Sequence, residues 1–113
     1  MAKSGIYLKG IDTLKRGLKE RATLQDVKNV VLLNGAEMNE AAKRNAPVKT
    51  GDLRGSIIQN TADGGLTSKT APSVDYAPYV EFGTRFMLGR FYLKKAFDVQ
   101  SVKFQRDMKR LVK

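Results

Sequence analysis

A segment in the middle of the chain, residues 46–57, constrains the fold most. Apolar residues recur at helical spacing before this segment and alternate as in strands after it. Pro47 disfavours the α conformation at Ala46, so a helix that reaches this point should end there. Gly51 suits a backbone turn with positive φ. The sequence therefore predicts a helix-to-strand junction.

The polar residues of the same segment suggest its local geometry. Thr50 and Asp52 can bond nearby backbone groups in a turn, or cap a short helical turn at Leu53 and Arg54. The plainest interpretation is a connector, because clusters of Gly and Pro most often only separate two elements.

The longest helix is expected just before this junction, over residues 23–46. Thr23 is its predicted N-cap, and Asp26 places a favourable charge in the first turn. Gly35, beside Asn34, interrupts the helix midway and predicts a kink or a close contact there. The apolar stripe of this helix consists of Val27, Val30, Val31, Met38, Ala41 and Ala42.

Apolar spacing predicts two further helices, one before and one after this region. A first helix is expected to start at Asp12 as N-cap, with Gly17 inside it and with Ile11, Leu14 and Leu18 on one face. The last helix is expected over residues 91–112. Its apolar face consists of Leu93, Ala96, Phe97, Phe104, Met108 and Leu111.

Three strands are expected, at residues 6–9, 56–61 and 66–71. The sequence Ala-Asp-Gly-Gly at residues 62–65 has the chemistry of a hairpin turn, so the second and third strands should form a hairpin. The third strand is polar, and we expect it at a sheet edge, where Lys69 would discourage pairing with another chain.

A second motif, Tyr-Ala-Pro-Tyr-Val-Glu-Phe-Gly-Thr at residues 76–84, predicts a short helix. Pro78 would lie in its first turn, and Gly83 would end it at C′ in the left-handed conformation. The core side of this helix is expected to carry Tyr76, Tyr79, Val80 and Phe82.

Glu81 lies among these apolar residues and has two possible environments. If it is buried, its carboxylate needs a partner, and Arg54 and Arg85 are the candidates. The alternative is an exposed Glu81 without such a partner.

Residues 84–90 follow no periodic pattern and hold three large apolar side chains between glycines. Exposed apolar clusters of this kind usually mark an interface. Phe86, Met87 and Leu88 are therefore the candidate residues for contact with another copy of the chain or with a partner protein.

The chain has 113 residues and a net charge of +10, which is unevenly distributed. Residues 1–22 carry six basic and two acidic side chains, residues 90–113 carry eight and two, and the middle is neutral. Such a distribution favours contact with polyanions, either nucleic acid or an acidic protein surface. The candidate contact residues are Lys94, Lys95, Lys103, Arg106, Lys109 and Arg110.

The chain contains neither cysteine nor histidine. Disulfides, the usual zinc sites and the Ser-His-Asp and Cys-His catalytic arrangements are thereby excluded. We expect no cofactor. The start of the chain has no secretion signal, and its longest aliphatic run, residues 30–33, is far shorter than the ~20 residues of a membrane span. A soluble intracellular protein without a membrane partner is expected.

The two motifs, in this order and about twenty residues apart, resemble a known family. They are similar to the small tail-component proteins of long-tailed bacteriophages and prophages, also described as head–tail joining or tail-completion proteins. The residues that carry the resemblance are Pro47, Gly51, Asp52, Leu53 and Arg54 in the first motif and Tyr76, Glu81, Gly83 and Thr84 in the second. Where the family commonly opens its last helix with Pro-Phe, this chain has Arg90 and Phe91.

The resemblance implies an α+β fold, in which a long central helix and a C-terminal helix pack a small antiparallel sheet within one domain, residues 1–113. It further implies a ring, with a hexamer favoured by the six-fold symmetry of long tails. The partners would be the connector or stopper, the tail terminator or the tail-tube proteins. The protein would lie in the virion, after assembly in the host cytoplasm. The resemblance supplies no catalytic residue.

Three functions compete at this point. The first is the structural ring protein. The second is a basic nucleic-acid-binding module with transient, nonspecific DNA contact, although no recognition motif for DNA or RNA is present. The third is a carboxylate-dependent enzyme built on Asp52, Asp75 and Glu81.

Overall fold

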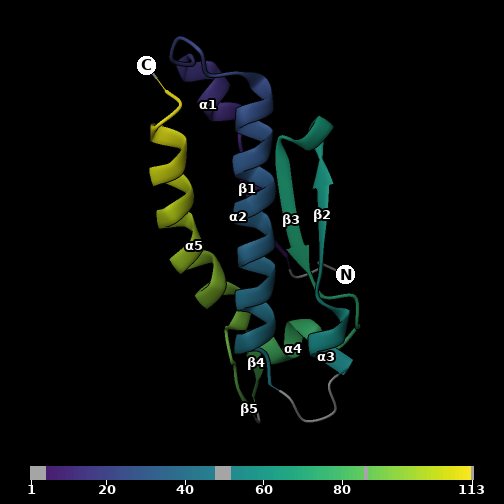
Figure 1. Cartoon of the computed structure of the whole chain (residues 1–113). Coiled ribbons are helices and arrows are strands. Elements are labelled where there is room, and N and C mark those ends of the chain that lie inside the picture. The colour runs from purple at the N-terminus through teal and green to yellow at the C-terminus, as the bar shows by residue number, and fades with distance from the viewer. Residues whose placement is uncertain (1–4, 48–51, 86, 113) are drawn as a thin grey trace.

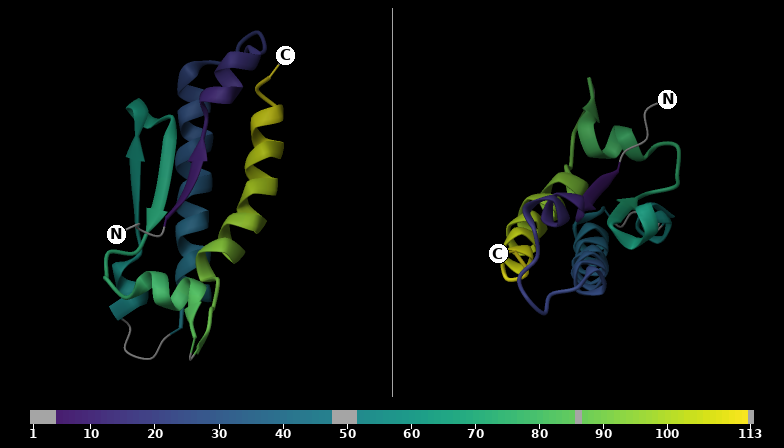
Figure 2. Two further views of the ribbon diagram at one scale, coloured as in Figure 1. Left: turned by 180° about the vertical axis from the view of Figure 1, so that it is seen from behind. Right: turned by 90° about the horizontal axis from the view of Figure 1, so that it is seen from above.

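Two long antiparallel helices and a small sheet dominate the computed structural model (Figure 1), which describes residues 5–47, 52–85 and 87–112. The helices are α2 (Leu24–Asn45) and α5 (Tyr92–Lys109). They make the molecule elongated, with extents of 53 × 23 × 21 Å (Figure 2).

The sheet contains β1 (Ile6–Lys9), β2 (Ile58–Ala62) and β3 (Thr67–Ala71) in the order β1-β3-β2, with antiparallel pairing throughout. Leu8 lies opposite Ser68, and Asn60 lies opposite Lys69. The three expected strands and the hairpin are therefore confirmed. The position expected for β3 is wrong, because this polar strand lies in the centre of the sheet.

A close approach of α2 explains why a polar strand occupies the centre. A Cβ atom placed on Gly35 would lie 2.0 Å from the Ser68 Oγ and 2.5 Å from the Gln59 Nε2. Only small side chains fit beneath α2 here, and Ser68 and Thr70 are both fully buried. The Gln59 amide donates to the Ser68 hydroxyl at 3.1 Å and to the Leu32 carbonyl at 3.2 Å, which satisfies polar groups that the contact buries.

The ends of α2 follow the expected rules. The Thr23 side chain accepts from the Asp26 N–H at 3.2 Å, and the Asp26 carboxylate accepts from the Thr23 N–H at 2.8 Å, which forms a capping box. At the other end, Ala46 is extended, with φ −70° and ψ 141°, directly before Pro47.

Six short elements complete the fold: α1 (Ile11–Arg16), α3 (Asp52–Ser56), the 3₁₀ turn η1 (Asp63–Gly65), α4 (Ala77–Phe82), β4 (Gly83–Thr84) and β5 (Met87–Leu88). The expected boundaries of α1 are wrong at both ends. Gly10 rather than Asp12 is its N-cap, and Gly17, with φ 91°, ends the helix instead of lying within it. Ser56 belongs to α3, so β2 begins at Ile58.

The core lies between the sheet, α2 and α5. Its buried residues include Leu8, Val27, Val31, Met38, Ala42, Leu93, Ala96, Phe104 and Met108. This arrangement confirms the α+β fold with a small antiparallel sheet packed by a long central helix and a C-terminal helix.

A polar network that the sequence did not suggest joins α2 to α5. The Gln100 amide donates to the Asn34 side-chain oxygen at 2.5 Å and to the Glu37 carboxylate at 2.8 Å. The Asn34 amide donates to the Asp107 carboxylate at 3.0 Å. The Lys103 ammonium pairs with Glu37, and its hydrogen bond, followed by that of Gln100, holds the pKa of Glu37 below the ordinary value of 4.5.

Candidate protein-contact surface

The second sequence motif forms α4 and the first strand of a small hairpin. Pro78 lies in the first turn of α4, as expected, and Gly83 ends the helix. Gly83 has φ 85° and ψ 178°. The expected positive φ is therefore confirmed, but the left-handed helical conformation is wrong. This region of φ and ψ is essentially restricted to glycine.

Glu81 is buried, with 2% of its surface exposed, and it caps another helix. Its carboxylate accepts hydrogen bonds from the backbone N–H groups of Leu93 at 2.8 Å and Lys94 at 3.1 Å. These are the second and third residues of α5, whose N–H groups have no partner within the helix. Both carboxylate oxygens thus bond backbone amides. Arg54, expected as a partner, instead donates to the Ala46 carbonyl at 3.2 Å.

The start of α5 explains why a distant carboxylate is needed. Phe91 is the N-cap residue, has a left-handed conformation with φ 49° and ψ 39°, and carries no oxygen that could cap the helix. The backbone N–H groups of Arg90 and Phe91 donate to the Val80 and Glu81 carbonyls at 2.8 and 3.0 Å. Gly89 permits this contact, because a Cβ atom there would lie 2.6 Å from the Glu81 carbonyl oxygen.

Tyr92 lies beside this cap and is fully buried. Its hydroxyl has no hydrogen-bond partner among the described residues. Burial, and then the nearby Glu81 carboxylate, raise the pKa of Tyr92 above its ordinary value of 10.0. The phenol therefore stays neutral and packs as a core side chain.

The aromatic side chains of the motif lie on the outside of α4. Tyr76, Tyr79 and Phe82 are 43%, 54% and 65% exposed, and the neighbouring Phe91 is 40% exposed. These four residues are called the aromatic ridge below. The expectation that Tyr76, Tyr79 and Phe82 face the core is wrong. The inward face of α4 instead carries Ala77 and Glu81, and helical spacing turns residues 76, 79 and 82 away from it.

The predicted interface segment lies next to the aromatic ridge. Met87 and Leu88 form β5, which pairs antiparallel with Gly83 and Thr84 in β4. The segment without a pattern is thus part of a hairpin, whose two-residue strands are too short to show alternation. Phe86 lies outside the described residues. A contact role for Phe86, Met87 and Leu88 stays a prediction.

The first sequence motif forms α3 and its connections at the same end of the molecule. Asp52 begins α3, Leu53 is 5% exposed, and Pro47 is half-buried. The Ser73 N–H donates to the Ser56 carbonyl at 3.2 Å, which ties α3 to the segment before α4. Gly51 lies outside the described residues, so its expected turn is not described.

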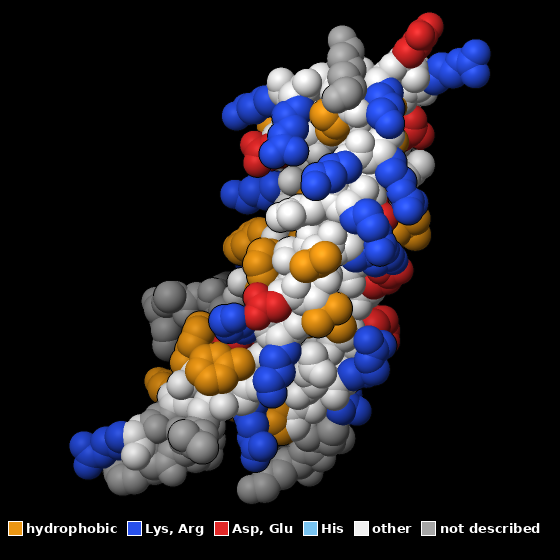
Figure 3. All heavy atoms as spheres, turned by 90° about the vertical axis from the view of Figure 1, so that its left-hand side faces the viewer, with side chains coloured by type: hydrophobic (Ala, Val, Ile, Leu, Met, Phe, Trp, Pro, Cys, Tyr) orange, Lys and Arg blue, Asp and Glu red, His pale blue; other side chains and the backbone are white. Residues whose placement is uncertain are grey.

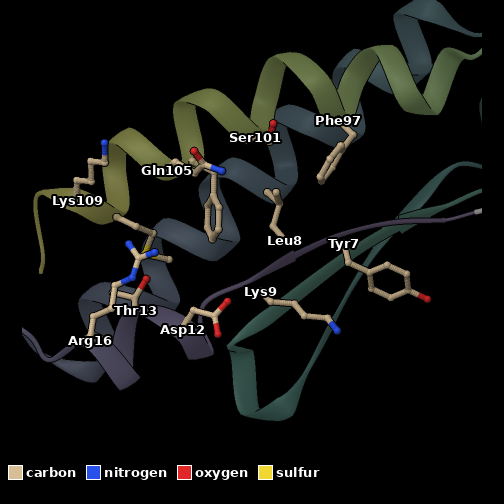
Figure 4. Close-up of a pocket in the computed structure, with 12 residues that line it drawn as sticks. Tyr7, Leu8, Lys9, Asp12, Thr13, Arg16, Phe97, Ser101, Gln105 and Lys109 are labelled. Carbon is tan, nitrogen blue, oxygen red and sulfur yellow. The ribbon is translucent and has the colours of Figure 1, made fainter.

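A groove of about 460 Å³ lies elsewhere, between β1 and α1 on one side and α5 on the other (Figure 4). Leu8, Phe97 and Phe104 line its apolar part. It does not include Asp52, Asp75 or Glu81, which the enzyme hypothesis would bring together.

Within the described ranges, no group of three or more acidic residues could hold a metal ion. None of the described helices combines the length and apolar character of a membrane span.

A family model described as "Bacteriophage HK97-gp10, putative tail-component" matches residues 9–83. This range runs from the end of β1 to the first residue of β4, and it contains the first motif and all of the second motif except Thr84. The chain belongs to this family. No curated protein and no solved structure matches it. The protein is therefore a phage tail-related component, and the resemblance of the two motifs is confirmed.

The six basic residues predicted as polyanion contacts do not form one cluster on this tail component. They extend from Lys94 to Arg110 along about 24 Å of helix at 1.5 Å per residue. Lys94 pairs with Asp98 at 2.6 Å, and Lys103 pairs with Glu37. Arg106 lies 4.0 Å from Asp107. Lys95 lies in the first turn of α5, whereas Lys109 and Arg110 lie at its far end.

Proposed function

We propose that this tail component is a non-catalytic structural protein that forms a ring, most simply a hexamer, at the head–tail junction or at the end of the tail tube. The whole chain, residues 1–113, would act as one domain. Its partners would be further copies of itself and the connector, stopper, tail terminator or tail-tube proteins of the virion, joined after synthesis in the host cytoplasm.

The aromatic ridge is the observation that carries this proposal. Large exposed apolar patches on a small domain mark contact sites, and Tyr and Phe are enriched in the cores of protein interfaces. Here the aromatic residues of the family motif face outward, while its single acidic residue is buried. A motif that served only the fold of the subunit would place its largest apolar side chains inside.

Ring closure requires a head-to-tail contact in which two different surfaces meet. The aromatic ridge, together with the adjacent β4–β5 hairpin, would supply one of them. Both lie at one end of an elongated subunit (Figure 1).

The burial of Glu81 supports a non-catalytic role. Both of its carboxylate oxygens accept from backbone amides, and the side chain is nearly inaccessible. Asp52 and Asp75 are both exposed. Asp52 begins α3, and Asp75 lies in the segment between β3 and α4. Among the described residues, the acidic side chain of the second motif is thus engaged by the start of α5, which supports a structural rather than a catalytic use of Glu81.

The test is a double substitution, Tyr79→Glu and Phe82→Glu, introduced into the phage genome. The matched control is Val99→Glu and Val102→Glu, because these residues of α5 have the same spacing and are 74% and 69% exposed. Glutamate is a good helix former, so both variants should fold. Circular dichroism of the purified proteins checks this.

The ridge variant should leave heads and tails that fail to join, or tails with abnormal ends, whereas the control should yield infectious particles. A Phe86→Asp, Met87→Asp variant tests the neighbouring hairpin in the same way. Normal particles from a folded ridge variant would contradict the proposed contact surface.

A further inference from the structure

The end of the first basic segment and the end of the last one meet at one end of the folded molecule. The backbone N–H of Lys19 donates to the Leu111 carbonyl at 2.7 Å, and Leu18 forms a β-bridge with Val112. Figure 1 shows α1 and the C-terminal end of α5 together, at the end opposite α4. The loop after α1 is thereby fixed against the end of α5, although the two are about ninety residues apart in sequence.

This convergence creates a cluster of unpaired cations, which we call the basic pole. Its members are all exposed and form no ion pair with any described residue: Lys15, Arg16, Lys19, Arg21, Lys109 and Arg110. Lys94 and Lys103, elsewhere on α5, are neutralised by Asp98 and Glu37. The basic pole thus brings together exposed cations from two distant parts of the sequence, and no ion pair with a described carboxylate neutralises them.

The figures show the same distribution. In Figure 3, Lys and Arg side chains lie over the whole face that α5 presents, and many of them lie over its upper half. In Figure 4, Arg16 from α1 and Lys109 from α5 lie at the same end of the groove. Exposed acidic residues near the pole are few, namely Asp12 and Glu20 in the α1 region.

We propose that the basic pole binds the phosphate backbone of duplex DNA without sequence preference. A duplex presents one negative charge about every 1.7 Å along its axis, which suits several long, flexible cations held at one end of a narrow molecule. An acidic protein partner is the less suitable occupant. The cores of protein interfaces are built on aromatic and apolar anchors, and the aromatic ridge of this chain lies at the other end of the molecule (Figure 1).

The absence of sequence preference follows from the geometry of the pole. Its side chains come from a six-residue helix, a loop and the last turn of α5. Lys and Arg side chains on such short elements can contact phosphates, but these contacts carry no sequence information by themselves. This binding requires no ring, so it can be measured on the isolated chain and does not depend on the proposed assembly.

The test compares two variants of equal charge. The pole variant carries Lys15→Gln, Arg16→Gln, Lys109→Gln and Arg110→Gln. The control carries Lys43→Gln, Arg44→Gln, Arg90→Gln and Lys95→Gln. These residues lie at the end of α2 and the start of α5, away from the basic pole. Each lowers the net charge from +10 by the same amount. Fluorescence anisotropy with a labelled duplex, titrated over a range of salt concentrations, measures binding.

The pole variant should lose at least about tenfold in affinity at low salt, and the slope of log K against log salt should fall by about one for each lost phosphate contact. The control should stay within about threefold of the parent, and a duplex of scrambled sequence should bind equally well. Equal losses in both variants, or no binding by the parent at low salt, would overturn the proposal. So would polyglutamate that competes more strongly than DNA at equal charge, because it would identify an acidic protein as the partner.

Discussion

Removal of the Glu81 carboxylate should weaken the start of α5. Glu81→Ala leaves the Leu93 and Lys94 N–H groups without their acceptors and removes a negative charge from the positive end of the helix dipole. A buried donor that loses its partner costs about 1–3 kcal/mol. Lys94 is exposed, so water can replace part of its bond. We expect a loss of about 2–4 kcal/mol for Glu81→Ala, and less for Glu81→Gln, which retains one acceptor.

Chemical denaturation and thermal melting measure this loss, which should lower the melting temperature by about 4 °C per kcal/mol. The control is Glu40→Ala on α2, since Glu40 is exposed and has no partner among the described residues. Amide hydrogen exchange localises the effect, because the Leu93 and Lys94 N–H groups should lose protection in Glu81→Ala alone. If Glu81→Ala and Glu40→Ala have the same melting temperature, the capping role of Glu81 is refuted.

Two further substitutions test backbone conformation and charge. Gly83→Val should cost on the order of 1–2 kcal/mol or more, because valine is strained at positive φ, and an unchanged melt would contradict the conformation assigned to Gly83. Glu37→Gln should destabilise the protein at neutral pH more than in acid. The folded-state pKa of Glu37 is lowered, so its contribution is present above the ordinary value of 4.5 and is lost as the pH falls through the folded-state pKa. A difference from the parent that is the same at about pH 7 and about pH 2 would contradict this pairing.

Local signals predicted most of the elements. The capping box at Thr23, the stop at Pro47 and the Asp-Gly-Gly turn each act within a few residues, so their effects can be deduced without knowing the tertiary structure. The apolar spacing of α5 likewise predicted its buried face. The limits of α1 were harder to predict, because Gly10 and Gly17 act as caps through backbone conformations that apolar spacing does not reveal.

Strand order depended on contacts between distant residues. A polar strand usually suggests an edge, but β3 is central because Gly35 lets α2 approach Ser68 closely. Gly35 interrupts the helical pattern, yet nothing near it in the sequence identifies the strand that it contacts. The meeting of the two basic ends has the same origin. Their charges were evident in the sequence, whereas the Lys19–Leu111 hydrogen bond that brings them together was not.

The side of α4 that faces the core was predicted wrongly for a related reason. An aromatic residue is expected inside and a carboxylate outside, and α4 reverses both because Glu81 has a better partner than water, namely the two free N–H groups at the start of α5. Once Glu81 is directed inward, the geometry of a helix leaves Tyr79 and Phe82 on the opposite side. The same buried bond that starts α5 therefore also orients the aromatic ridge, so one motif links the stability of the subunit to the surface through which it is proposed to assemble.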